Sequence, residues 1–109
     1  MPHLKFRGIK KELIIENSKE IIDGLTAIVK CDREWFTLEH IETEYIFDGK
    51  IIPGYTFAEV FWFPRDKETK DKFAAFLTET LKRINNNNDT CIMFFDLVGE
   101  NYYDNGKHF

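Results

Sequence analysis

The sequence carries the same strand–helix–strand pattern twice, and this repeat restricts the fold more than any other feature of the chain. In the first unit, residues 2–47, apolar residues recur every three or four positions over 10–31, as on one face of a helix. In the second unit, residues 58–98, the helical stretch is 67–84. A right-handed crossover makes the two strands of each unit parallel. The repeat therefore predicts an α+β fold, in which a four-stranded mixed sheet carries two helices on one face.

Local signals set the expected limits of these elements. The predicted strands, by alternation or by short apolar runs, are residues 3–9, 35–47, 58–64 and 90–98. The segment "DGK" predicts a hairpin turn, and Pro53 and Gly54 interrupt pairing after it. Asp66 is expected to cap the second helix, and Asp32 is a candidate cap in the turn after the first.

The two helices leave the other face of the sheet uncovered. Segments 58–64 and 91–95 are nonetheless apolar at consecutive positions, which places apolar side chains on both faces of a strand. We therefore expect a second copy of the chain to cover the open face, so that the chain is its own partner in a homo-oligomer.

The composition excludes several classes of protein. Of 109 residues, 43% are apolar and 16% aromatic, which suffices for a packed core and a single domain over residues 1–109. A net charge of -4 without a dense basic block argues against nucleic acid as a partner. No apolar run is long enough to span a membrane, and no signal peptide leads the chain. We expect a cytoplasmic protein with no membrane partner.

The chemistry-bearing residues do not form a recognisable metal or cofactor site. Cys31 and Cys91 lie far apart and lack the spacing of metal ligands, so both are expected to be reduced thiols. His40 stands in the middle of a strand and is expected to be a half-buried structural residue. The sequence has no glycine-rich phosphate loop and no nucleophile elbow. We therefore expect no metal and no cofactor.

Pro2 is the candidate of greatest chemical interest. Methionine is normally removed when the second residue is small, and the loss of Met1 would leave Pro2 with a free secondary amine. Near neutral pH, such an amine can take a proton from a carbon next to a carbonyl group and return it elsewhere. The structural alternative is a proline that begins an edge strand, where no ladder hydrogen bond is lost.

The two ends of the chain resemble those of a known superfamily. The chain opens "MPHLKFRG" and ends "FFDLVGENYYDNGKHF", where Asp96, Asn101, Asn105 and Phe109 fall on like residues of the macrophage migration inhibitory factor chain. With the repeated β-α-β plan, the chain resembles the tautomerase superfamily, and most closely a small bacterial family of unknown function within it. The resemblance implies a homotrimer and a cofactor-independent tautomerase or isomerase of a small 2-oxo acid or enol, with Pro2 as general base.

The resemblance also points to two cations that would bind a substrate carboxylate or carbonyl. Arg65 follows the third strand, where the decarboxylase of the superfamily has an arginine, and Arg33 is nearest to the lysine that follows the first helix in the migration factor. A surface ion pair with the adjacent aspartate is the alternative for each. Cys91 and Met93 replace a tyrosine and an asparagine of the family site. The rival functions are therefore a non-catalytic oligomeric or small-ligand-binding protein and, third, a protein–protein adaptor.

Overall fold

The structure is a computed structural model that describes residues 2–108; Met1, with its predicted removal, and Phe109 lie outside the described residues. The two long helices and the first six strands follow the order expected from the sequence, and the C-terminal segment adds two short strands that were not expected. The elements are β1 (His3–Arg7), α1 (Lys11–Val29), η1 (Arg33–Trp35), β2 (Thr37–His40), β3 (Tyr45–Phe47), β4 (Lys50–Ile52), β5 (Thr56–Trp62), α2 (Lys67–Ile84), β6 (Thr90–Asp96), η2 (Gly99–Asn101), β7 (Tyr103–Asp104) and β8 (Lys107–His108).

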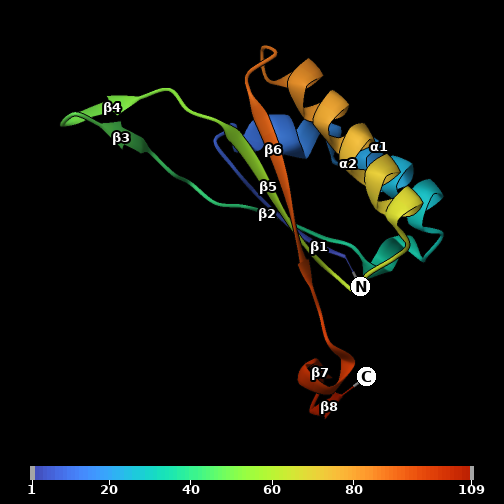
Figure 1. Cartoon of the computed structure of the whole chain (residues 1–109). Helices are drawn as coiled ribbons and strands as arrows, with labels where there is room; N and C mark the ends of the chain where they lie inside the picture. Colours follow the sequence, from blue (N-terminus) through green and yellow to red (C-terminus); the bar gives the residue numbers. More distant parts are fainter. Residues whose placement is uncertain (1, 109) are drawn as a thin grey trace.

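The main sheet confirms the predicted four-stranded mixed sheet with parallel strands inside each unit, and it adds the strand order, which was not predicted. Its strand order is β2-β1-β5-β6. Strands β1 and β2 are parallel, as are β5 and β6, whereas β1 and β5 meet antiparallel in the centre. The two β-α-β units therefore join side by side into one mixed sheet. Both helices cover the same face of it (Figure 1).

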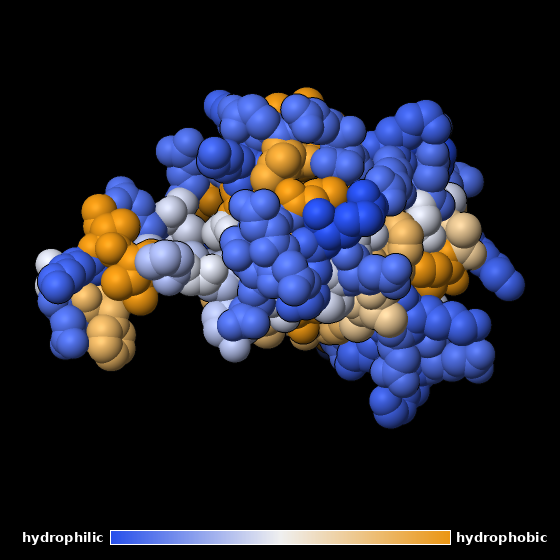
Figure 2. Space-filling model, turned by 90° about the horizontal axis from the view of Figure 1, so that it is seen from above, coloured by the Kyte–Doolittle hydropathy of each residue, from blue (hydrophilic) through white to orange (hydrophobic). Residues whose placement is uncertain are grey.

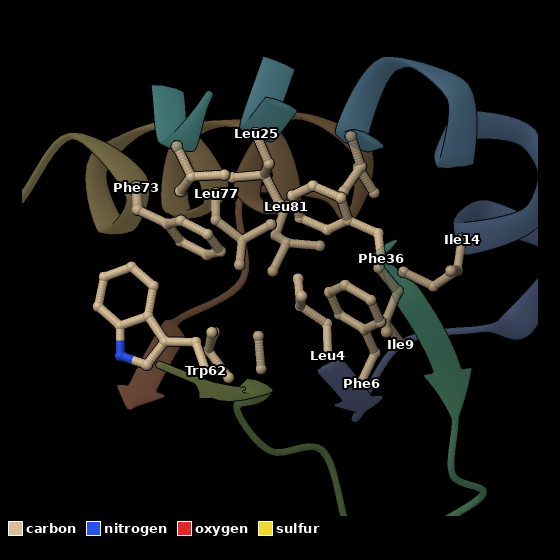
Figure 3. Packing of buried hydrophobic residues seen from close by; sticks show 14 residues of the cluster. Leu4, Phe6, Ile9, Ile14, Leu25, Phe36, Trp62, Phe73, Leu77 and Leu81 are labelled. Carbon is tan, nitrogen blue, oxygen red and sulfur yellow. The ribbon is translucent and has the colours of Figure 1, made fainter. Parts of the chain in front are cut away.

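The core lies between the helices and the covered face of the sheet (Figure 3). Alternate residues of β1 and β5 point into it, because side chains along a strand alternate between its faces. The stripes of α1 and α2, at helical spacing, meet them from above. The fully or almost fully buried apolar side chains include Leu4, Phe6, Ile21, Leu25, Val60, Trp62, Phe73, Leu77 and Leu81.

The predicted strand over residues 35–47 is divided in the structure. Strand β2 ends at His40, opposite Phe6 of β1, and β3 pairs instead with β4 in a separate hairpin. The partner strand β1 ends at Arg7, and the chain turns at Gly8, which has φ +78°. The residues beyond His40 therefore have no β1 residues left to pair with. An alternating pattern reports extended backbone but does not report a change of partner.

Two segments project from the body of the molecule (Figure 1). One is the β3–β4 hairpin, and the other is the C-terminal β7–β8 hairpin. The first carries the exposed apolar residues Ile46, Phe47 and Ile51, each about two-thirds exposed or more. Its hydrophobic atoms stand at one end of the molecule in Figure 2. Within residues 2–108, neither helix combines the length and apolar character needed to cross a lipid bilayer.

The two predicted helix caps behave differently. Asp66 accepts a hydrogen bond from the Thr69 N–H at 2.9 Å and so caps α2, as predicted. Asp32 occupies the N-cap position of η1, but its side chain makes no capping hydrogen bond.

A buried polar contact joins the two β-α-β units at the far end of the sheet. Asn85, which follows α2, is 8% exposed. Its Nδ2 donates to Thr56 Oγ1 at 2.7 Å and to the Gly8 carbonyl oxygen at 3.2 Å. The amide therefore ties the end of α2 to β5 and to the turn after β1.

Candidate functional site

Pro2 lies immediately before β1 and is fully buried. Its carbonyl oxygen accepts a hydrogen bond from the Thr37 N–H at 3.2 Å, which fixes it beside the start of β2. In the unprocessed chain, the Pro2 nitrogen is an amide bonded to Met1. Removal of Met1 would therefore free the lone pair of this nitrogen.

The sheet topology gathers several connections around Pro2. His3 of β1 lies opposite Thr37 of β2 and opposite Phe61 of β5, and Phe61 lies opposite Phe95 of β6. The starts of β1 and β2 and the ends of β5 and β6 therefore lie together at one end of the strands, here called the Pro2 edge of the sheet (Figure 1). The connections that follow α1 and β5 reach the same edge, so Cys31 and Arg65 belong to the neighbourhood of Pro2.

His3 links this edge to the C-terminal segment. One ring nitrogen lies 2.7 Å from the Thr37 hydroxyl oxygen and the other 2.7 Å from the Tyr102 hydroxyl oxygen. The Tyr102 ring also meets Phe63 edge-on, with 5.3 Å between centroids. Burial lowers the pKa of His3 and raises that of Tyr102. Both groups are therefore neutral near pH 7, and they hold the C-terminal segment next to Pro2.

Arg65 is held at the end of the β5–α2 connection. Its Nη1 donates to the Phe63 carbonyl oxygen at 2.8 Å. Burial raises the pKa of the Cys31 thiol, while the positive charge of Arg65 acts on it in the opposite direction. Arg65 therefore lies within electrostatic reach of Cys31, on the side of the molecule where Pro2 begins the sheet. The structure places this predicted site residue at the same edge as Pro2.

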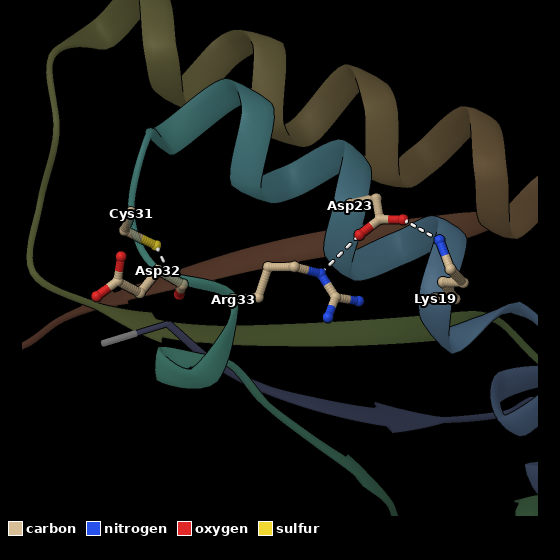
Figure 4. A network of polar contacts seen from close by, with 5 residues as sticks. All are labelled: Lys19, Asp23, Cys31, Asp32 and Arg33. Atoms are coloured by element: carbon tan, nitrogen blue, oxygen red, sulfur yellow. Dashed lines mark hydrogen bonds and ion pairs between the residues drawn. The ribbon is translucent and has the colours of Figure 1, made fainter.

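The Arg33 side chain is turned toward α1, where it pairs with Asp23. Its Nε donates to the Asp23 carboxylate at 2.7 Å, and Lys19 contacts the other oxygen of the same carboxylate at 2.8 Å. Hydrogen bonds from Lys19 and Arg33 lower the pKa of Asp23. Figure 4 shows the Arg33 side chain extended along α1, away from Cys31. The partner is thus Asp23 rather than the adjacent Asp32, and the structure does not bring the Arg33 guanidinium group together with Pro2.

Two hollows and His40 lie apart from the Pro2 edge. Hollows of about 580 and 810 Å³ open at the opposite edge, beside Phe57 and beside His40 respectively. His40 is half-buried, and its Nε2 lies 2.7 Å from the Ile9 carbonyl oxygen, consistent with a structural role. Within residues 2–108, no three His, Cys, Asp or Glu residues are grouped as metal ligands would be.

Sequence reasoning missed one participant in the site. Tyr102 lies 99 positions from His3 in the chain, in a polar and aromatic segment whose function the sequence left open. No local pattern indicates that this segment returns to the start of β1. The aromatic character of "NYY" was the available signal, because a tyrosine that packs against the protein usually finds a hydrogen-bond partner for its hydroxyl group.

Comparisons with known proteins connect the chain to one family. The sequence pattern of a family described as "Domain of unknown function (DUF1904)" matches residues 1–108. A crystal structure of a DUF1904 domain from Sebaldella termitidis is similar over 100% of both chains, with 42% identity and a TM-score of 0.93. No match to the chain was found among curated proteins.

More distant structures share the fold. A macrophage migration inhibitory factor-like protein from Entamoeba histolytica has a TM-score of 0.77 at 16% identity, covering 99% of this chain and 98% of its own. A fused 4-OT, solved as an asymmetric trimer, has a TM-score of 0.82 at 14% identity, covering 97% and 94%. The predicted resemblance to the tautomerase superfamily is therefore confirmed at the level of fold.

Proposed function

The chain belongs to the DUF1904 family, and from that premise we propose that it is a cofactor-independent tautomerase or isomerase of a small 2-oxo acid or enol. The observation that carries the proposal is the place of Pro2. It is the second residue of the chain, buried at the sheet edge, and held by the Thr37 N–H. The tautomerase-like fold of the neighbours supports the same reading.

In this proposal, the nitrogen of Pro2 is the general base. After removal of Met1, its lone pair takes a proton from the carbon next to the substrate carbonyl group. The electrons of the broken C–H bond move into the enolate, and return of the proton to another atom completes the isomerisation. A free α-amine has a pKa of about 7.7–8, and a secondary amine starts higher. Burial and the positive charge of Arg65 both favour the neutral amine, so a useful base exists near neutral pH.

Arg65 is proposed to hold the carboxylate of the substrate. Its contact with the Phe63 carbonyl oxygen orients the guanidinium group through one nitrogen. A planar guanidinium group binds a carboxylate through two parallel hydrogen bonds, which would fix the orientation of a 2-oxo acid. Arg33 is the weaker candidate for this role, because a substrate would first have to displace the carboxylate of Asp23.

The experiment that tests the proposal follows hydrogen–deuterium exchange at the carbon next to the carbonyl group of pyruvate, 2-oxobutyrate and phenylpyruvate by NMR. Mass spectrometry first establishes whether Met1 is absent from the native protein. Pro2→Ala is expected to slow exchange about a hundredfold or more, the usual contribution of a general base. Inserting a lysine between Met1 and Pro2, which blocks removal of the methionine, should have the same effect. Pro53→Ala, in the exposed loop after β4, is the matched control.

A second candidate function is a non-catalytic oligomeric or small-ligand-binding protein. It is favoured by Cys91 and Met93, which lie on the open face of β6 where the family resemblance leads one to expect a tyrosine and an asparagine. If Met1 is absent and wild type and Pro2→Ala exchange the substrates equally slowly, the enzyme proposal fails and this second function gains.

We also propose that the chain assembles with itself, as a homotrimer. The open sheet face carries the stacked rings of Phe61 and Phe95, and the β3–β4 hairpin leaves the side chain of Ile46 72% exposed. Surfaces of this kind usually mark an interface between proteins. Light scattering after size exclusion should report a trimer for the wild type. Ile46→Asp should dissociate it, whereas Ile15→Asp, a similarly exposed isoleucine on α1, should not.

A further inference from the structure

A small cationic groove opens beside the start of α2, where this helix passes over the edge strand β6. Its volume is about 370 Å³, and its lining includes Arg65, Lys67, Lys70, Asp71 and Phe94. Sites for small molecules are typically hollows of about 300–1,000 Å³ in which an apolar surface meets a few convergent polar groups. This groove has both, and it lies on the covered face of the sheet.

Two cations of the groove lack an acidic partner among residues 2–108. The Lys67 ammonium contacts both carboxylate oxygens of Asp71 at 3.1 Å, so the charges of these two side chains compensate each other. Glu68, on the same helix, is paired with Lys72. Within residues 2–108, by contrast, no carboxylate lies within 4.0 Å of the Arg65 or Lys70 nitrogens.

The acid nearest in sequence to these two cations is also engaged. The carboxylate of Asp66 accepts the hydrogen bond from the Thr69 N–H that caps α2. Arg65 donates to a main-chain carbonyl oxygen, that of Phe63, rather than to a carboxylate of residues 2–108. The groove therefore holds an excess of positive charge that the described chain does not compensate.

An aromatic ring lies beneath these charges. The Lys70 ammonium stands 5.4 Å from the centroid of the Phe94 ring. Trp62, which is 1% exposed, and Phe73 pack against the same ring at 4.7 and 5.5 Å between centroids. Phe94 is thus held rigidly from the core side, while its outer side faces the groove. A flat apolar group can lie on such a ring, and an anionic group attached to it would meet the cations above.

We propose that this groove binds a small aromatic carboxylate, whose carboxylate lies between Arg65 and Lys70 and whose ring lies on Phe94. Both parts of the ligand are required by the chemistry of the lining: the charge by the unpaired cations and the ring by the phenyl surface. The groove shares Arg65 with the proposed substrate site, but binding in the groove does not depend on the proposed proton transfer. It occurs whether or not the nitrogen of Pro2 is free.

The tryptophans provide a direct readout. The chain contains two, and Trp62 is in contact with the ring that would receive the ligand. In a Trp35→Phe background, fluorescence therefore reports on Trp62 alone. Titration with benzoate should change this fluorescence saturably, with a dissociation constant on the order of 1 mM, as expected for so small a ligand. Benzamide keeps the ring without the charge, and acetate keeps the charge without the ring. Each should bind at least about tenfold more weakly than benzoate.

Variants separate the cations of the groove from their neighbours. Lys70→Ala and Arg65→Ala should each weaken benzoate binding about tenfold or more. Lys72→Ala, on the same helix but paired with Glu68 outside the groove, should leave it unchanged. Pro2→Ala should also leave it unchanged, so that failure of the proposed enzyme function and failure of this site are distinguishable. Equal binding of benzamide and benzoate, equal effects of Lys70→Ala and Lys72→Ala, or no saturable change with benzoate would each overturn the proposal.

Discussion

Asn85→Ala tests the packing that joins the two β-α-β units. The substitution removes hydrogen bonds to Thr56 Oγ1 and to the Gly8 carbonyl oxygen, and Thr56 is fully buried. A buried polar group left without its partner costs about 1–3 kcal/mol, so the free energy of unfolding should fall by about 2–4 kcal/mol. Urea denaturation followed by circular dichroism measures it. The change should appear in the midpoint, because the surface exposed on unfolding is nearly unaltered.

The control for this prediction stands in the same run of asparagines. Asn88 is exposed, and its hydrogen bonds within residues 2–108 come from its main chain, so Asn88→Ala should change the free energy of unfolding by no more than about 0.5 kcal/mol. A double-mutant cycle with Thr56→Val should give a coupling energy of about 1 kcal/mol or more, since the two side chains are in contact. Equal effects of Asn85→Ala and Asn88→Ala would refute the reasoning.

Two further predictions concern stability. Gly8→Ala should destabilise the fold by about 2–4 kcal/mol in thermal or urea melts, because the new Cβ would lie 2.0 Å from the Tyr55 carbonyl oxygen. Gly49→Ala, at a similar positive φ with nothing within 4 Å, should cost clearly less, and equal costs would exclude the steric cause. Burial lowers the pKa of His3 below its ordinary 6.5, so the unfolded chain binds a proton more readily than the folded one. The stabilising contribution is complete above pH 6.5 and is lost as the pH falls through the lower folded-state pKa. His3→Gln should remove this part of the pH dependence of unfolding, and an unchanged pH profile would contradict the assignment.

The sequence predicts those parts of the fold that depend on local periodicity. The stripes that bury Leu25 and Leu77 recur at three and four residues, and the strands alternate or run apolar, so element type and order follow from neighbours in the chain. The right-handed crossover then sets the parallel pairing within each unit. The four-stranded sheet with both helices on one face needs no further information.

The parts that could not be predicted depend on contacts between distant residues. Arg33 pairs with Asp23, ten positions earlier on α1, rather than with its neighbour Asp32, because the chain turns back along the helix. Asn85 is buried while Asn88 of the same polar run is exposed, and only the end of α2 determines which of them faces Thr56. Tertiary packing determines these contacts, and local residue patterns do not predict it.

The residues of the candidate site also differ in whether the sequence could indicate them. Pro2 could be proposed from the sequence, because the chemistry expected of it would arise from its position behind Met1. The approach of Arg65 to the same edge follows from the antiparallel pairing of β1 with β5, which the structure shows and the sequence did not predict. The return of Tyr102 to His3 had no counterpart in the sequence, because a terminal segment of polar and aromatic residues can end in many places.

The most direct test of the central claim is a nitrogen-15 NMR titration of the native protein labelled at proline, in which the signal of Pro2 is assigned with Pro2→Ala. The account predicts a secondary amine that titrates near neutral pH, with a pKa no higher than about 8. It also predicts a rise of this pKa in Arg65→Ala, because the neighbouring positive charge is lost. A Pro2 nitrogen that does not titrate, or whose pKa is that of free proline in wild type and Arg65→Ala alike, would contradict the account.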